Sequence, residues 1–344
     1  MELGIGMFGD LKYDHHTGAY QPAAERLQEI IEEVKLADES GVDVFLMGEH
    51  HRPDYAVSTP EIMLAALVSV TKNIKLASGV TVLSSVDPVK IFQDFSMLDL
   101  MSNQRIEITA GRGSFIESFP LFGYDLKDYN ELFEEKLDLL LKLNENEVLN
   151  WKGKFRAPLV DQTIYPRPER KLPVWIAVGG TPNSVVRAAK FGLPIVFAII
   201  GGRWEQFEPL IDLYKQQYKA HGHDLDQMQL GVHSHTFIAD SKMQLMEEYF
   251  PYYKAQMDRI GKERGWLPYT KMQFEGGMSP EGALVMGDAN QAAEKIIAMA
   301  EKFGLTRYVA HIDVGFPGHQ QMMKVIELYA TKVIPQVKKA LAKS

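Results

Sequence analysis

Residues 173–194 read PVWIAVGGTPNSVVRAAKFGLP. The apolar, β-branched run Val174–Val178 predicts a buried strand, and the two glycines after it predict a tight turn. Thr181 suits the N-cap of a following helix and Pro182 its first position, which leaves backbone N–H groups free at the helix start. Glycines before a helix N-terminus let a phosphate approach such donors. The stretch therefore predicts a strand, a turn and a helix, and indicates either a site for a phosphate-bearing cofactor or an ordinary strand-to-helix turn.

The same strand-then-helix pattern recurs along the whole chain. Strands are predicted at residues 1–8, 42–47, 74–83, 105–110, 174–178, 195–200, 228–239 and 309–314, with helices between them. This alternation, without a low-complexity linker, favours a single (β/α)8 TIM barrel over a doubly wound sheet, with residues 1–344 as one domain. The last two strands lie too far apart for one connection, so residues 251–287 are predicted to be an insertion and a candidate lid.

The composition excludes several classes of function. The chain has 344 residues, of which 46% are hydrophobic, a formal net charge of -8 and no cysteine. The acidic balance argues against nucleic acid as a partner, and the lack of cysteine excludes disulfides, thiolate metal sites and a cysteine nucleophile. No apolar run is long enough to span a bilayer, and the amino terminus lacks a signal-peptide pattern. We therefore expect a cytoplasmic protein with neither nucleic acid nor a membrane as a partner.

A barrel would gather the residues that follow its strands at one end, where this fold carries its chemistry. These residues are His50, His51, Ser84, Ser85, Arg112, Gly180, Thr181, Ser184, His235 and Asp313. Arg112 can bind phosphate oxygens with a bidentate fork, so with the helix start at Thr181 it indicates a phosphate site. His50 and His51 point to opposite sides of an extended segment, so only one of them can serve the site.

Four short stretches carry a resemblance to a known family. They are Glu49-His50-His51, Gly111-Arg112-Gly113, Gly179-Gly180-Thr181-Pro182 and Phe191-Gly192-Leu193-Pro194. With these stretches in this order and next to these strands, the chain resembles the luciferase-like monooxygenase family of flavin- or deazaflavin-dependent oxidoreductases over essentially its whole length.

The resemblance implies a (β/α)8 barrel that binds FMN at the carboxyl ends of its strands. The cofactor-binding residues that it implies are Gly79, Val80, Arg112, Gly179, Gly180, Thr181 and Ser184. Arg112 and the last residues of this set would hold the phosphate, and the isoalloxazine ring would pack at a non-prolyl cis peptide near Gly79-Val80. His50 falls on the family's active-site histidine, a position suited to proton transfer or hydrogen bonding near neutral pH.

The implied activity is monooxygenation of a small organic substrate with reduced FMN and O2. The reduced flavin would come from a separate NAD(P)H:flavin reductase or be formed in place, and a deazaflavin is the alternative cofactor. The resemblance also implies a homodimer built on the helices after the second and third strands, and the predicted helix over residues 62–70 is apolar nearly all round. Gly111 stands where bacterial luciferase carries a reactive cysteine, so light emission from a long-chain aldehyde is not expected.

Two rival functions come from other classes. His233-Ser234-His235 and His311-Ile312-Asp313 each place two metal-ligand side chains on one strand face, as in barrel metallohydrolases. Those enzymes carry their His-x-His motif on the first strand, where this chain has none, so no residue is assigned as a metal ligand. The other rival is a flavin-binding protein that has lost its catalytic function.

Overall fold

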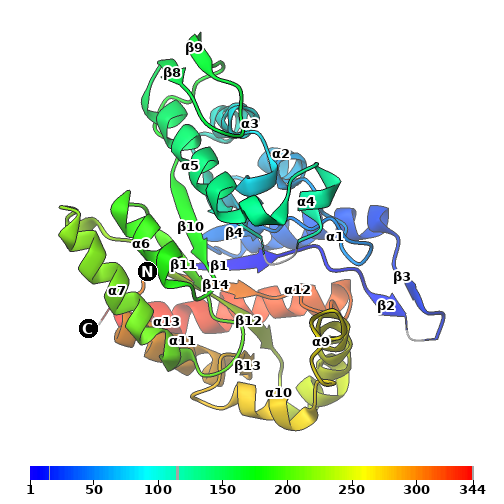
Figure 1. Cartoon of the computed structure of the whole chain (residues 1–344). Coiled ribbons are helices and arrows are strands. Elements are labelled where there is room, and N and C mark those ends of the chain that lie inside the picture. The colour runs from blue at the N-terminus through cyan, green and yellow to red at the C-terminus, as the bar shows by residue number, and fades with distance from the viewer. Residues whose placement is uncertain (15, 114–115, 343–344) are drawn as a thin grey trace.

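The computed structural model describes residues 1–14, 16–113 and 116–342. Its centre is a closed barrel of parallel strands, as the alternation of elements predicts (Figure 1). The barrel strands are β1 (Glu2–Met7), β4 (Val44–Met47), β5 (Lys75–Ser78), β7 (Ile106–Gly111), β10 (Val174–Val178), β11 (Ile195–Ala198), β12 (Leu230–Ile238) and β14 (Arg307–His311). The pairing of β7 with β10, in which Ile108 lies opposite Val174, closes the ring.

Helices follow the barrel strands and cover the outside of the barrel. They are α1 (Ala23–Glu39), α2 (Pro60–Val70), α3 (Pro88–Ser102), α5 (Tyr129–Glu145), α6 (Pro182–Lys190), α7 (Glu208–Ala220), α11 (Ala289–Phe303), α12 (His319–Leu328) and α13 (Ile334–Leu341). Each buries one apolar stripe against the strands: in α1 the buried residues Ile30, Val34 and Ala37 recur at helical spacing. The main hydrophobic core therefore lies between the strands and the helices. In the described part of the chain, no helix combines the length and apolar character needed to cross a membrane.

Two predicted strands have different limits in the structure. The predicted strand over residues 74–83 is split at a cis peptide between Gly79 and Val80, the position that the resemblance implied, and continues as β6 (Thr81–Val82). The eighth strand begins at Arg307 because Arg307 pairs with Glu2, and it ends at His311. Asp313 therefore lies just beyond the strand, at the carboxyl end of the barrel.

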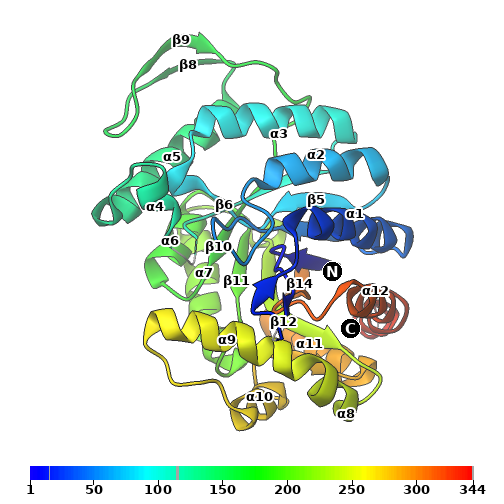
Figure 2. The same cartoon turned by 90° about the vertical axis from the view of Figure 1, so that its right-hand side faces the viewer.

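The long connection between β12 and β14 contains the predicted insertion. It holds α8 (Lys242–Gln244), α9 (Phe250–Arg264), α10 (Lys271–Met278) and a short strand, β13 (Val285–Gly287), which pairs in parallel with the end of β12. The insertion is followed by α11, which serves as the outer helix of this unit. Figure 2 shows α9 and α10 beside the ends of β12 and β14, on the side of the barrel away from α2 and α3.

A hairpin projects beyond α3 and α5 (Figure 1). Its strands are β8 (Val148–Trp151) and β9 (Leu159–Thr163). The two strands pair in the antiparallel direction, with Val148 opposite Thr163. A second, short hairpin, β2 (Tyr13–Asp14) with β3 (Ala19–Tyr20), follows β1.

Candidate functional site

Arg112, Thr181 and Ser184 come together at the carboxyl end of the barrel, and we call them the phosphate-side cluster. One terminal nitrogen of Arg112, Nη2, donates to Thr181 Oγ1 at 3.1 Å and to Ser184 Oγ at 3.0 Å. Arg112 directly follows β7 and Thr181 opens α6, so the pairing of β7 with β10 makes them neighbours. The sequence-predicted phosphate residues are therefore adjacent in the fold.

Thr181 and Pro182 have the predicted positions at the start of α6. Thr181 occupies the N-cap and Pro182 follows it, and the Thr181 side chain makes no capping hydrogen bond. Its hydroxyl contacts Arg112 and Ser184. The charged donor of Arg112 thus uses the oxygen that could otherwise cap the helix.

Two residues that the sequence reasoning missed hold Arg112 in place. Asn130 Oδ1 accepts from Arg112 Nη1 at 2.6 Å, and the guanidinium lies 4.8 Å from the ring centre of Tyr129. Both residues belong to the first turn of α5, and no local sequence signal marks them as partners of an arginine. They fix the side chain in the direction of α6.

The space next to the phosphate-side cluster is open. A Cβ atom added at Gly179 or Gly180 would meet no heavy atom within 4 Å. Gly180 has φ +124, a conformation that side-chain-bearing residues rarely adopt, so this turn favours glycine. A guanidinium, two hydroxyls and the first backbone N–H groups of α6 therefore border a space in which an anion can be bound.

The turn at Gly79–Val80 lies against Gly111. A Cβ at Gly111 would lie 2.8 Å from Val80 Cγ1, which leaves no room for a larger side chain without movement. This close approach gives a physical reason for the glycine at position 111. The resemblance implies that bacterial luciferase carries a reactive cysteine at this position.

His50 and His51 make contacts on different sides of the segment, as predicted from their adjacency. His51 Nε2 lies 2.9 Å from Glu49 Oε1, and Glu49 Oε2 accepts from the backbone N–H of Val82 at 2.8 Å. His51 therefore supports β6 through Glu49.

His50 is buried among aromatic rings. Its ring centre lies 4.9 Å from that of Phe8 and 4.3 Å from that of Tyr55. Burial, with a smaller contribution from His311, lowers the pKa of His50 to about 3. The imidazole is therefore neutral near neutral pH, a state in which one ring nitrogen carries a proton and the other can accept one.

His311 and Asp313, from one of the two candidate metal motifs, form with Asp10 a cluster that we call the floor of the barrel mouth. Asp10, His311 and Asp313 offer ligand atoms within 4.8 Å of one another. The Asp313 carboxylate, however, already has hydrogen-bond partners in the protein. It accepts from the backbone N–H groups of Phe8, Gly9 and Asp10 at 3.0, 2.9 and 3.3 Å. It also faces the buried guanidinium of Arg26 at 3.4 Å. These donors and the neighbouring cation favour a structural role for Asp313.

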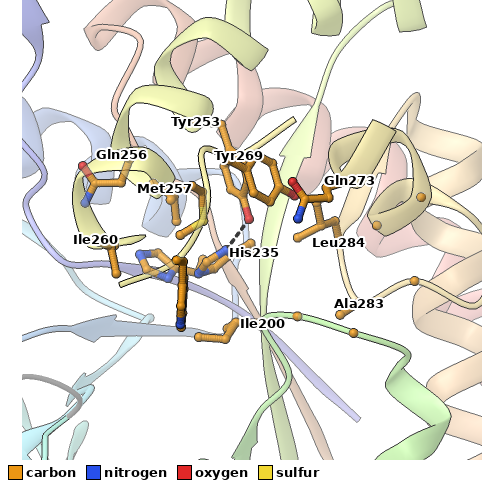
Figure 3. A pocket seen from close by; sticks show the side chains of 18 of the residues that line it. Ile200, His235, Tyr253, Gln256, Met257, Ile260, Tyr269, Gln273, Ala283 and Leu284 are labelled. Carbon is orange, nitrogen blue, oxygen red and sulfur yellow. Dashed lines mark hydrogen bonds between the residues drawn. The ribbon is translucent and has the colours of Figure 1, made fainter. Parts of the chain in front are cut away.

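A cavity of about 1080 Å³ lies beside this floor, between the strand ends and the insertion (Figure 3). Its walls are largely apolar and include Phe8, Ile200, Met257, Ile260, Trp266 and Leu284. Its polar residues include His235, Tyr253 and Gln256. Arg112 and Ser184 do not belong to the described lining, so the cavity and the phosphate-side cluster are separate parts of one mouth. The sequence predicted a lid here but not this cavity.

Comparison with known sequences gives the family. The family model described as luciferase-like monooxygenase matches residues 1–307. The alkanal monooxygenase alpha chain of Photobacterium leiognathi is 24% identical over 95% of this chain and 99% of its own length. The N-acetyl-S-alkylcysteine monooxygenase of Bacillus subtilis is 31% identical over 53% of both chains. The oxygenase component of the flavin-dependent trigonelline monooxygenase of Acinetobacter baylyi is 24% identical over 64% of this chain and 62% of its own.

Solved structures share the fold. The monooxygenase RslO1 of Streptomyces bottropensis has a TM-score of 0.82 at 20% identity, covering 97% of this chain and 99% of its own. The oxygenating constituent of 3,6-diketocamphane monooxygenase of Pseudomonas putida, in complex with FMN, has a TM-score of 0.77 at 20% identity and 98% coverage of both chains. The coenzyme F420-dependent tetrahydromethanopterin reductase of Methanopyrus kandleri has a TM-score of 0.72 at 17% identity, covering 98% and 99%. At these identities the likeness concerns the fold alone.

The buried histidines predict how stability depends on pH. Burial lowers the pKa of His233 from its ordinary value of 6.5 to about 3, so between these pH values unfolding takes up a proton at this ring. The free energy of unfolding therefore falls as the pH falls below about 6.5, by up to about 1.4 kcal/mol per pH unit for this group. We expect His233→Leu to remove that contribution in urea unfolding measured between about pH 4 and pH 6.

The control is Val309→Ala, a change in the same barrel interior that removes no titrating group. It should lower the free energy of unfolding at every pH and leave the slope against pH unchanged. An equal slope in wild type and His233→Leu would contradict the prediction.

Proposed function

We propose that this chain, which belongs to the luciferase-like monooxygenase family, uses reduced FMN and O2 to oxidise a small organic substrate. Family membership rests on the match over residues 1–307 and makes the chain a flavin-dependent monooxygenase. The observation that carries the finer proposal is the convergence of Arg112, Thr181 and Ser184 beside open space at the start of α6. We further propose that residues 1–344 act as one domain.

The phosphate-side cluster fits the phosphate of FMN. Arg112 supplies a charged donor, and the Thr181 and Ser184 hydroxyls can turn to donate to an anion. The start of α6 adds backbone N–H groups and the positive end of the helix dipole. Gly179 and Gly180 let the backbone approach without side-chain bulk. We therefore assign these residues to the phosphate.

We assign Gly79 and Val80 to the isoalloxazine ring and His50 to the reaction. When bound, reduced FMN supplies the electrons with which O2 is activated and one oxygen atom is transferred to the substrate. His50 is buried and neutral, so its ring can hold a proton at one nitrogen and receive one at the other. The aromatic rings around His50 exclude water from its vicinity.

Two relatives support FMN and a separate source of electrons. The diketocamphane monooxygenase structure contains FMN, and the trigonelline enzyme is named as an oxygenase component. We infer that a NAD(P)H:flavin reductase supplies this chain with reduced FMN. A deazaflavin is the second candidate, because a likeness in fold extends to an F420-dependent reductase and the phosphate-side cluster suits both cofactors. Family membership favours a flavin- or deazaflavin-dependent enzyme over a metal-dependent hydrolase. Measurable turnover would separate an enzyme from a non-catalytic flavin-binding protein.

We also propose a homodimer that forms through α2 and α3. The two helices pack side by side (Figure 2), and both carry apolar side chains on the outer surface. Ile62 is 72% exposed, Met97 50% and Met101 56%. A second copy of the chain that covers this face would bury these side chains, which is the usual fate of a large apolar patch.

The phosphate assignment predicts the effect of removing the guanidinium. Arg112→Ala should weaken FMN binding about 10- to 100-fold, because a hydrogen bond to a charged group contributes about 1.5–3 kcal/mol. Titration of FMN against protein, followed by flavin fluorescence, measures this. Lys190→Ala, at the other end of α6, removes the same charge and should leave the affinity unchanged. Equal FMN affinities of Arg112→Ala and wild type would refute the assignment. The same titration with F420 in place of FMN compares the two cofactors.

The role of His50 predicts a separation of turnover from binding. His50→Asn should lower the turnover number at least about 100-fold, a typical contribution of acid–base catalysis, while FMN affinity stays within about twofold of wild type. Steady-state oxygen consumption, measured together with the amount of product formed, gives the turnover number. The FMN titration gives the affinity. Unchanged turnover would remove His50 from the mechanism, and a matching loss of FMN binding would make it a cofactor residue instead.

The dimer proposal predicts a monomeric variant. Ile62→Glu combined with Met97→Glu places two charges in the apolar face and should halve the molar mass measured by light scattering after size exclusion. Met243→Glu changes a methionine that is 68% exposed on α8, in the connection between β12 and β14, and should remain dimeric. A wild-type protein that is monomeric at micromolar concentration would contradict the proposal.

A further inference from the structure

The interior of the cavity offers no uncompensated charge to a ligand. Asp10 reaches its wall, but this carboxyl accepts from the backbone N–H of Gly315 at 2.9 Å and lies near the cations Arg26 and Arg259. Burial and the neighbouring Asp313 raise the pKa of Asp10 well above its usual range. A substrate carboxylate would lose its hydration there without gaining a cationic partner, and an ammonium group would compete with two arginines.

The charged side chains at the rim do not change this picture. The exposed side chains that line the opening are Arg203, Arg264 and Glu281. Their charges are of both signs, and water screens them because the side chains are exposed. Arg203 also pairs with Glu205 at 3.2 Å. The rim therefore gives no preference for a substrate of one charge.

His235 is a polar residue that borders the cavity and can contact a substrate there. It lies near the end of β12, and its Nδ1 is 3.0 Å from the hydroxyl of Tyr253 on α9 (Figure 3). Among the described residues no side chain or backbone group is hydrogen-bonded to its other nitrogen, Nε2, and His235 borders the cavity. Burial lowers the pKa of His235 well below its ordinary value and raises that of Tyr253, so both are neutral.

Tyr253 fixes the direction of this imidazole. Its ring packs against His235 with centres 5.7 Å apart at 77°, and against Tyr269 at 5.6 Å. In the tautomer in which the Tyr253 hydroxyl donates to Nδ1, Nε2 carries the imidazole proton and can donate it to a ligand oxygen. A neutral imidazole and a phenol form a pair that suits an uncharged oxygen, since a bound ion would need a charged partner.

We propose that the substrate is an uncharged, largely apolar molecule whose carbonyl or hydroxyl oxygen is hydrogen-bonded by His235, with Tyr253 as the positioning residue. This inference rests on the proposed function, because it takes the cavity to be the substrate site of the monooxygenase. The cavity volume of about 1080 Å³ slightly exceeds the range of about 300–1,000 Å³ for small-molecule sites, so the cavity accommodates a bulky apolar body.

Four probes of nearly equal shape test the proposal by equilibrium dialysis: 2-acetylnaphthalene, 2-ethylnaphthalene, 2-naphthoate and 2-naphthylmethylammonium. We expect the acetyl compound to bind about three- to tenfold more tightly than the ethyl compound, the range expected for one neutral hydrogen bond. Both charged probes should bind at least about tenfold more weakly than the acetyl compound. A naphthoate or ammonium affinity equal to that of the acetyl compound would overturn the proposal.

Variants then assign the preference to residues. His235→Phe should bring the acetyl-to-ethyl affinity ratio to about one, and Tyr253→Phe should reduce the ratio while the affinity for 2-ethylnaphthalene stays unchanged. His221→Phe, an exposed histidine at the end of α7, is the matched control and should keep the wild-type ratio. If His235→Phe does not fold, Tyr253→Phe decides alone. A wild-type ratio in the folded His235 and Tyr253 variants would refute the assignment.

The dialysis is run with and without FMN, and FMN affinity is measured separately. If FMN fails to bind while the acetyl preference and its dependence on His235 persist, the proposed cofactor is wrong but the cavity assignment stands. If FMN binds and the preference is absent, the substrate inference alone fails.

Discussion

The parallel pairing of β7 with β10 is the interaction on which the candidate site depends. It closes the barrel, and its register places Ile176 opposite Ala110. Residues just beyond both strands are therefore held side by side, and Arg112 reaches the hydroxyls at the start of α6. In another sheet order the same residues would lie apart. The convergence of the phosphate-side cluster is thus a consequence of strand closure, which backbone hydrogen bonds and buried apolar side chains maintain.

A second constraint is the contact between Asp313, just after β14, and the backbone just after β1. The carboxylate is completely buried and accepts from the backbone just after β1, while Arg26 of α1 faces both Asp313 and Glu33. Buried charges cost several kcal/mol each in lost hydration, so this network persists only because every member has partners. It fixes the loop that carries Phe8, and the Phe8 ring in turn packs on His50. Buried charges therefore help to position the uncharged ring of His50.

The barrel could be predicted from the sequence because strands buried on both faces form uninterrupted apolar runs, such as Val174–Val178. The approach of Arg112 to Thr181 could also be predicted, since both residues directly follow strands of a barrel. The support of Arg112 by Asn130 could not, because nothing in the first turn of a helix marks an asparagine as an arginine partner. The cavity could not be predicted for a similar reason, because its walls come from strand ends and from the insertion. Only the packing of these segments shows that His235 and Tyr253 are in contact.

Two kinds of contact hold α9 beside the barrel. One side of α9 carries apolar residues and Tyr253. Polar contacts join the helix to the loop after β4: Arg52 with Glu263, Arg259 with Asp54 and, in the cavity wall, Gln256 with Tyr55. Glu263 is 47% exposed, so water can replace its ion pair at a cost of about 1 kcal/mol or less. Movement of the apolar side alone would expose hydrophobic surface to water and is opposed more strongly. The exposed ion pair is therefore the weaker attachment of α9, and the buried apolar side of the helix is the stronger one.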